Sequence, residues 1–333
     1  FSGDAGKGAL VDGSYAESAS KEASCLFHSV TFITPGVTAL SCTNGARVEW
    51  LNCFTYFAQK SIHAFDSAIG KKSDGKTVIK AKKSRDHTEN IFKYLGIPVL
   101  VKKNKHDDEI RVKGQKTFKS FKYKVPSDPS SCAFFIVLTL LSKNCELKIK
   151  NVNVNQSRIG YIKILNQMGA KIKIKNIKVR YREKQGDIHV KSQPYLKKIN
   201  CPSNLNSNLI DEFLIIFLAA AKANGISNFT NLGELNKKES PRLKLGSKLL
   251  NQLGIKTKLT KDSIKIFGDP NINIKKNISI KNYYKDHRIF MTSVIAAIIF
   301  GGKWKIYDVE SYKSSFPSFL DIIKKLGFKF KLV

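Results

Sequence analysis

The sequence predicts an α/β (α+β) protein of repeated βαβαββ units, with its most apolar helices buried and its sheets outside. Two observations carry this prediction. Four segments end alike, with the tail of an amphipathic helix, then a glycine, then the alternating pattern of a strand. Upstream of three of them lies a helix that is apolar on nearly every face and therefore belongs in the core. Repetition of this kind indicates units that bury their apolar faces by stacking on one another.

Each of the four similar segments places its glycine where a helix needs a left-handed cap. The segments are IFKYLGIPVLV (91–101), ILNQMGAKIKI (164–174), LLNQLGIKTKL (249–259) and IIKKLGFKFKL (322–332). The capping glycines are Gly96, Gly169, Gly254 and Gly327. We therefore expect a helix to end and a strand to begin at each of these glycines.

An aspartate introduces each of the three apolar helices. Pro129 follows the first of them and suits the first helical position. An aspartate side chain placed there accepts hydrogen bonds from free backbone N–H groups of the first turn. The simplest interpretation of all three aspartates is that they are N-caps, namely Asp128, Asp211 and Asp286.

These patterns divide the chain near residue 73. We expect residues 1–72 to be an atypical segment, unrelated to the rest or misread, because residues 1–59 hold three basic and five acidic residues and lack a clear period. Residues 73–124 form one unit, the remnant of a first lobe, and residues 125–333 form a second lobe. The three repeats of the second lobe are 125–190, 205–268 and 283–333.

Composition restricts the partners and the compartment. Lys and Arg number 58 against 26 Asp and Glu, a net charge of +32 that favours anionic partners. The lysines are spread along the chain instead of clustered in one arm, which weakens the case for nucleic acid. The six cysteines show no metal-like spacing and indicate a reduced, cytoplasmic setting. The apolar runs are too short to cross a bilayer, so we expect no membrane span.

Charged residues gather where the helices of the units begin. Free N–H groups and the helix dipole make such ends suitable for anions. Each charged stretch alone is more simply a solvated turn, but all of them fall at equivalent points of one repeat. The stretches are SRDHTE (84–89), NKKESPR (236–242) and KDHRIFM (285–291). We therefore expect several units to contribute to a single anionic pocket.

Residues 73–333 resemble the 5-enolpyruvylshikimate-3-phosphate (EPSP) synthases, also called 3-phosphoshikimate 1-carboxyvinyltransferases. The resemblance rests on SRDHTEN, DPSSCAFF, DEF, KKESPRL, DHRIFM and SSFPSF, which follow in the family's order. It implies the inside-out α/β fold of the enolpyruvyl transferases. It also implies transfer of the enolpyruvyl group of phosphoenolpyruvate to the 5-hydroxyl of shikimate 3-phosphate, with release of phosphate. The resemblance implies no metal or organic cofactor, and we expect a monomer.

The same resemblance assigns roles to residues that match the family's motifs. Asp211 is expected to be the base for the attacking hydroxyl, while Lys238 and Glu239 are expected to exchange the proton at the enolpyruvyl carbon. The expected shikimate 3-phosphate ligands are Ser84, Arg85, Gln59, Asp211 and Lys238. The expected phosphoenolpyruvate ligands are Lys238, Arg242, Arg288 and Gln59.

Two departures from the family pattern bear on these expectations. Pro241 stands where the motif has an aspartate, which could alter the turn that aims Arg242. Residues 1–72 lack the family's Gly-Asp-Lys-Ser and Asn-x-Gly-Thr signatures, so we expect an incomplete first lobe and no turnover by this chain alone.

Two alternatives remain open at this point. The related UDP-N-acetylglucosamine enolpyruvyl transferase shares the architecture but relies on a loop cysteine, for which no cysteine here is a convincing match. A basic, non-enzymatic nucleic-acid-binding protein would need exposed aromatic residues among clustered cations. The aromatic residues here lie mostly in apolar periodic runs, which disfavours that class.

Overall fold

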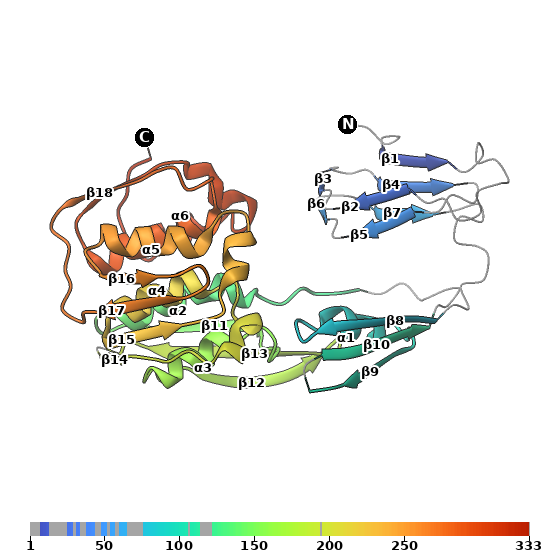
Figure 1. Ribbon diagram of the computed structural model, residues 1–333, viewed down its shortest axis with the longest axis horizontal. Coiled ribbons are helices and arrows are strands. Elements are labelled where there is room, and N and C mark those ends of the chain that lie inside the picture. The colour runs from blue at the N-terminus through green and yellow to red at the C-terminus, as the bar shows by residue number, and fades with distance from the viewer. Residues whose placement is uncertain are drawn as a thin grey trace. The chain divides into compact units, whose positions relative to one another are not determined.

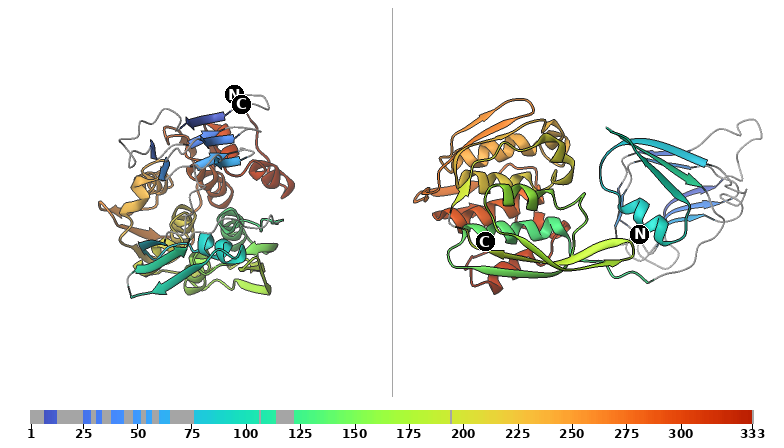
Figure 2. Two further views of the ribbon diagram at one scale, coloured as in Figure 1. Left: turned by 90° about the vertical axis from the view of Figure 1, so that its right-hand side faces the viewer. Right: turned by 90° about the horizontal axis from the view of Figure 1, so that it is seen from below.

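The chain divides into two compact units. The N-terminal unit comprises residues 1–81 and 95–120, and the C-terminal unit comprises residues 82–94 and 121–333. The computed structural model (Figures 1 and 2) describes residues 7–12, 25–28, 31–33, 38–43, 48–51, 54–56, 60–64, 76–105, 107–113, 122–193 and 195–332.

Short strands make up the described part of the N-terminal unit. β2 (Cys25–His28), β3 (Thr31–Ile33) and β4 (Thr38–Thr43) pair in parallel, in that order, with the next three strands along the chain. Those partners are β5 (Val48–Leu51), β6 (Phe54–Tyr56) and β7 (Lys60–Ala64), and β1 (Lys7–Asp12) adds to β4. A second sheet has the order β8 (Lys76–Lys82), β10 (Asp107–Lys113), β9 (Val99–Lys103). Strands therefore form where the sequence shows no clear period.

The C-terminal unit begins with α1 (His87–Tyr94) and continues with three similar repeats. The first contains α2 (Pro129–Leu141), β11 (Glu146–Asn153), α3 (Gly160–Gln167), β12 (Lys173–Arg180) and β13 (Glu183–Lys191). The second contains β14 (Leu196–Lys197), α4 (Phe213–Ala221), β15 (Ala223–Phe229), α5 (Arg242–Gln252), β16 (Thr257–Leu259) and β17 (Ile264–Gly268). The third contains β18 (Asn277–Ile280), α6 (His287–Phe300), β19 (Lys303–Ile306) and α7 (Phe319–Lys325).

Short 3₁₀ helices fill the connections of the second and third repeats. They are η2 (Ser203–Asn208), η3 (Gly233–Lys237) and η4 (Val309–Ser314). Each repeat has its own outer sheet, with the strand orders β11-β13-β12, β14-β15-β17-β16 and β18-β19. The sequence thus predicts the alternation of helices and strands correctly in the first two repeats. In the third repeat the strand expected after Gly327 is wrong, because residues 328–332 pair with no other described strand and have no regular secondary structure.

The core of the C-terminal unit is a bundle of the three most apolar helices. α2, α4 and α6 contact one another, and the amphipathic α5 packs on both α4 and α6 (Figures 1 and 2). Every residue of α4 is buried, as its uniformly apolar sequence predicts. Among the described residues, no helix combines the length and apolar character needed to cross a membrane.

The four glycines that close the amphipathic helices adopt the left-handed conformation. Gly96, Gly169, Gly254 and Gly327 have φ angles of 77°, 100°, 84° and 89°. A side chain at such a φ is sterically disfavoured, which explains why glycine recurs at this point of the pattern. The predicted caps are therefore confirmed.

One glycine of the second repeat is required by close approach of backbone. A Cβ atom on Gly268, at the end of β17, would overlap the carbonyl oxygens of Ala220 and Ala223. We predict that Gly268→Ala lowers the free energy of unfolding by about 3 kcal/mol, because backbone atoms must shift to admit the methyl group. Chemical denaturation of the full chain measures this loss.

Gly233→Ala is the matched control, since a Cβ there would lie 3.7 Å from the Cβ of Asp262, an ordinary contact. This variant should stay within about 0.5 kcal/mol of the parent. Equal stability of the two variants would contradict the proposed overlap at Gly268.

Candidate functional site

Two of the three aspartates at the helix starts are N-caps, and the third is not. Asp128 accepts from the backbone N of Ser131 at 2.8 Å, and Asp286 accepts from the N of Arg288 at 2.8 Å. Before α4, the capping position belongs to Glu212, whose side chain makes no capping bond. The interpretation of Asp211 as an N-cap is therefore wrong. The chain turns tightly over residues 209–212, which frees the Asp211 carboxylate for other partners.

The Asp211 carboxylate lies among four cationic side chains. Its Oδ2 accepts from Arg85 Nη2 at 2.5 Å and lies 4.0 Å from Arg288 Nη2. Its Oδ1 lies 3.6 Å from Lys238 Nζ and 3.5 Å from Arg242 Nη1. Arg85 comes from the segment before α1, Lys238 and Arg242 come from the turn before α5 and its first residue, and Arg288 comes from the first turn of α6. Three separate parts of the C-terminal unit thus meet at one carboxylate.

The cations keep Asp211 ionised although it is mostly buried. Burial alone would raise the pKa of this carboxyl, but the charges of Arg288, Arg85 and Lys238 outweigh burial and hold the pKa well below its usual range. The Asp211 side chain is 14% exposed, so the pair with Arg85 is partly shielded from solvent. At neutral pH the cluster is a carboxylate surrounded by an excess of positive charge, a setting that suits anionic ligands.

A buried ion pair connects the first residue of α5 to the start of α6. Arg242 is 1% exposed, and its Nε donates to Asp286 Oδ2 at 2.9 Å. Ser240 Oγ donates to the same oxygen at 2.7 Å. Because Asp286 also caps α6, this one carboxylate sets the position of both the turn and the helix. Pro241 directly precedes α5, and with it in place Arg242 meets Asp286 and Asp211.

Arg288 and Glu239 complete the cluster through contacts with Asp211 and Arg242, respectively. Arg288 Nη1 donates to the backbone oxygen of Asp211 at 2.9 Å, which fixes the guanidinium against the turn before α4. Glu239 lies at the surface and its Oε2 is 2.5 Å from Arg242 Nη2. Burial and the charge of Arg288 lower the pKa of the neighbouring His287, so its imidazole is neutral at neutral pH.

The segment before α1 is held by a polar network on Glu183. Glu183 Oε1 accepts from His87 at 2.8 Å and from Asn90 at 3.1 Å, and its Oε2 accepts from Asn153 and Asn155, each at 3.2 Å. Burial would raise the pKa of Glu183, but the bonds from His87, Asn90 and Asn155 lower it to about 2. The network fixes α1 to β13 and so positions Arg85, two residues before the helix.

Comparison with protein-family models matches residues 68–323 to EPSP synthase (3-phosphoshikimate 1-carboxyvinyltransferase). The chain belongs to the EPSP synthase family. The match includes every described member of the Asp211 cluster. Four of the motifs that carry the resemblance, SRDHTEN, DEF, KKESPRL and DHRIFM, supply the residues of this cluster.

Curated relatives agree with this assignment. The 3-phosphoshikimate 1-carboxyvinyltransferase of Ruthia magnifica subsp. Calyptogena magnifica is 37% identical over 299 residues, which cover 90% of this chain and 67% of that protein. The enzyme of the same name from Thermodesulfovibrio yellowstonii is 36% identical over 252 residues, covering 75% of this chain and 56% of the relative. Because the first alignment covers 90% of the chain, it includes part of residues 1–59.

Solved structures confirm the predicted fold class. The EPSP synthase from Acinetobacter baumannii is similar with a TM-score of 0.69 and 32% identity, over 76% of this chain and 57% of that one. The enolpyruvyl transferase NikO from Streptomyces tendae, at 14% identity and a TM-score of 0.56, shares the fold. The chain therefore spans 56% to 67% of the length of these relatives.

Most of the residues expected from the family resemblance lie together. The structure brings six of them into one cluster, namely Arg85, Asp211, Lys238, Glu239, Arg242 and Arg288. Ser84 is exposed and adjoins Arg85 in the chain. Gln59 lies outside the described residues.

Two carboxyl groups of the site are not among the residues that the sequence motifs predict. Glu212 is fully buried beside Asp211, burial raises its pKa, and its Oε1 has no hydrogen-bond partner among the described residues. Glu183 is the acceptor for His87, 96 residues earlier in the chain. The adjacent acids of the sequence DEF are a local signal for Glu212, whereas nothing local indicates Glu183.

One group in this region has a geometry that suits a metal ion. Ligand atoms of Asp86, His87 and Glu183 lie within 4.8 Å of one another. Both oxygens of Glu183 already accept hydrogen bonds, and Asp86 accepts from Asn155 at 2.6 Å. A cation would have to displace these donors, so we interpret the group as a polar network that positions α1.

We predict that Asp286→Asn lowers the free energy of unfolding by about 3 kcal/mol, because it removes one charge of a buried pair and leaves Arg242 poorly matched. Denaturation of the full chain measures the effect. Asp269→Asn is the control, since Asp269 is exposed and its carboxylate accepts a local bond from the N of Asn271. A loss no larger than that of the control would contradict the role of Asp286.

We predict a pH-dependent contribution from Glu183. Its pKa is about 2 when folded and about 4.3 in an unfolded chain. Its stabilising contribution is therefore complete above about pH 5 and decreases as the pH falls toward 2. Denaturation from pH 6 to pH 3 should show the parent losing its advantage over Glu183→Gln as acid is added. A difference that is constant over this range would contradict the assignment.

Proposed function

We propose that this chain serves enolpyruvyl transfer from phosphoenolpyruvate to the 5-hydroxyl of shikimate 3-phosphate, with release of phosphate. The observation that carries the proposal is the Asp211 carboxylate surrounded by Arg85, Lys238, Arg242 and Arg288. Both reactants are anions, and a preformed group of cations offsets their mutual repulsion. The family assignment and the names of the relatives support the choice of substrates.

In this proposal the oxygen of the 5-hydroxyl forms a bond to the central carbon of phosphoenolpyruvate. Asp211 accepts the proton that this hydroxyl loses. Lys238 and Glu239 exchange the proton that the methylene carbon of phosphoenolpyruvate gains in this addition and loses when phosphate departs. Loss of that proton and of phosphate restores the double bond, so atoms and charge balance. General acid and base groups of this kind contribute by proton transfer in the transition state.

The cations divide between the two substrates. Ser84, Arg85, Lys238 and Gln59 are assigned to shikimate 3-phosphate. Arg288, Lys238, Gln59 and the Nη1 edge of Arg242 are assigned to phosphoenolpyruvate, since Arg favours paired contacts to oxyanions. When the substrate anions engage these cations, the cations stabilise the Asp211 carboxylate less. The pKa of Asp211 then rises toward its usual range, which makes it a better base.

The proposal also includes the cellular compartment and the oligomeric state of the protein. A monomer in the cytoplasm is proposed, on the strength of the family and of the cysteine usage. Because the chain spans only part of the relatives' length, we propose binding at the Asp211 cluster as its measurable activity. The expectation that the chain alone gives no turnover remains a prediction.

Calorimetry with shikimate 3-phosphate, with and without phosphoenolpyruvate, tests the proposal. We predict saturable binding of shikimate 3-phosphate that becomes tighter when phosphoenolpyruvate is present. Arg288→Ala should weaken binding of the pair at least about tenfold, because it removes a charge-assisted contact. Lys248→Ala is the matched control, since it removes the same charge from an exposed position of α5.

Two outcomes would overturn the proposal. Binding of UDP-N-acetylglucosamine in place of shikimate 3-phosphate would indicate the related transferase. Salt-sensitive binding of random oligonucleotides, without binding of either small substrate, would indicate the nucleic-acid class.

A further inference from the structure

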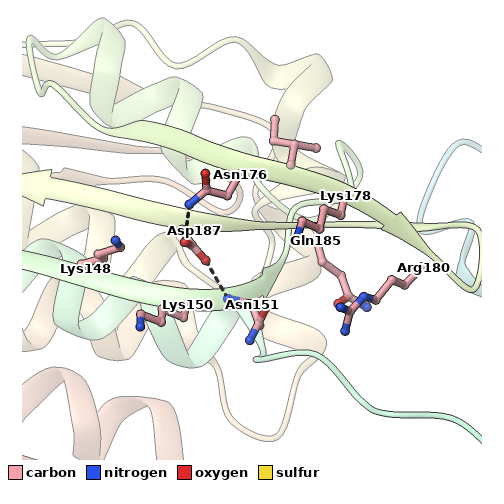
Figure 3. Close-up of a pocket in the computed structure, with 9 residues that line it drawn as sticks. Lys148, Lys150, Asn151, Asn176, Lys178, Arg180, Gln185 and Asp187 are labelled. Atoms are coloured by element: carbon pink, nitrogen blue, oxygen red, sulfur yellow. Dashed lines mark hydrogen bonds between the residues drawn. The ribbon is translucent and has the colours of Figure 1, made fainter.

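The outer sheet of the first repeat carries a basic pocket that shares no residue with the Asp211 cluster. Its volume is about 410 Å³, within the range of small-molecule sites. It lies across strands β11, β13 and β12 (Figure 3). Its lining residues are Lys148, Lys150, Asn151, Asn176, Ile177, Lys178, Arg180, Gln185 and Asp187.

Two breaks in strand register shape the pocket. Pairing with β13 shifts between Ile149 and Val152 on β11, and between Lys175 and Lys178 on β12. At each break stands an asparagine in the left-handed conformation, a residue type that tolerates it. These are Asn151, with φ 53°, and Asn176, with φ 52°. The two irregularities face each other across β13 and interrupt the flat surface of the sheet.

A single carboxylate ties the two irregularities together. Asp187 accepts from the backbone N of Asn151 at 3.1 Å and from the Asn176 side chain at 2.8 Å (Figure 3). The hydrogen bond from Asn176 and then that from Asn151 lower the pKa of Asp187. Asp187 thus links the two irregular strands that form the pocket, and each of its carboxylate oxygens already accepts a hydrogen bond.

Four cations line the pocket against this one carboxylate. Figure 3 shows Lys148 and Lys150 toward one side of Asp187, and Lys178 and Arg180 toward the other. Among the described residues, the only lysine of this sheet with an ion-pair partner is Lys191, which pairs with Glu146 outside the pocket. The pocket therefore has a strong excess of unneutralised positive charge.

A buried amide distinguishes this pocket from an ordinary lysine-rich surface. Gln185 is 6% exposed, lines the pocket, and its Nε2 has no hydrogen-bond partner among the described residues. Buried donors in folded proteins are almost always satisfied, so a donor without a partner needs an explanation. An anionic oxygen held between Arg180 and the lysines would supply the acceptor that Gln185 lacks.

We propose that this pocket is a second anion site, which binds a small molecule with two or more phosphoryl groups. Four cations and a buried amide donor match an extended array of phosphate oxygens, with Arg180 suited to a paired contact. The ligand is small because the groups converge on one pocket of limited volume and do not follow a long groove. The proposal is independent of the Asp211 cluster and of the function assigned to it.

Lysine acetylation footprinting tests the proposal at individual residues. The full chain is treated with an acetylating reagent at increasing concentrations of tripolyphosphate, pyrophosphate or inorganic phosphate, and labelling is read by mass spectrometry. We expect saturable protection of Lys148, Lys150 and Lys178, with tripolyphosphate effective at lower concentration than inorganic phosphate. Lys173 and Lys184 are internal controls, because both are exposed on the same sheet outside the pocket.

Variants separate a built pocket from general charge. Gln185→Glu is nearly isosteric and replaces the donor with a carboxylate, so it should weaken tripolyphosphate binding at least about tenfold. Lys148→Gln with Lys178→Gln should do the same, whereas the matched pair Lys173→Gln with Lys184→Gln should change binding less than about twofold. Circular dichroism and a melting curve identify any variant that fails to fold. If a variant does not fold, the protection of the pocket lysines in the parent chain still tests the proposal.

Three outcomes would overturn the proposal. One is equal protection of the pocket and control lysines, which would indicate general screening by salt. Another is no protection at millimolar tripolyphosphate. The third is stronger protection, across the whole sheet, by a single-stranded oligonucleotide, which would indicate an open surface for nucleic acid.

Discussion

The buried pair of Arg242 and Asp286 holds the candidate site of this protein in place. Asp286 caps α6 and at the same time binds Arg242, the first residue of α5, and Ser240 from the turn before that helix. Arg242 in turn reaches Asp211 at the start of the second repeat. An ion pair removed from solvent is stabilising only when its hydrogen bonds are satisfied. Here the cap, the serine and the guanidinium share one carboxylate, so the start of α6 and the turn before α5 cannot move independently.

The packing of the apolar helices explains why these groups meet. α2, α4 and α6 are buried against one another, and a charged residue within any of them would be costly to desolvate. Charge is therefore confined to the helix ends and the turns beside them. The cations that surround Asp211 lie at such helix ends and turns. Asp211 partly neutralises this positive region before any anion arrives.

The charges of the basic pocket in the outer sheet are positioned by different structural features from those of the Asp211 cluster. In the cluster, helix ends and long-range ion pairs place the charges, and each of the four cations lies within ion-pair distance of Asp211. In the pocket, paired strand irregularities place the charges, Asp187 braces the strands, and the four cations have no ion-pair partner among the described residues. A high net charge by itself indicates little about where a ligand binds. Cations without a carboxylate partner indicate the places where an anion is attracted most strongly.

The sequence by itself determined the repeats, the buried helices, the capping glycines and the motifs that mark the family, because these features depend on local periodicity and backbone conformation. Only the tertiary structure decided which polar ends meet. It showed that Asp211 is not a cap, that Arg85 reaches it across 126 residues, and that Glu183 holds His87 across 96. It also left the amide of Gln185 buried without an acceptor. Such contacts depend on the packing of whole repeats against one another. The hydrophobic period of a single helix or strand does not predict them.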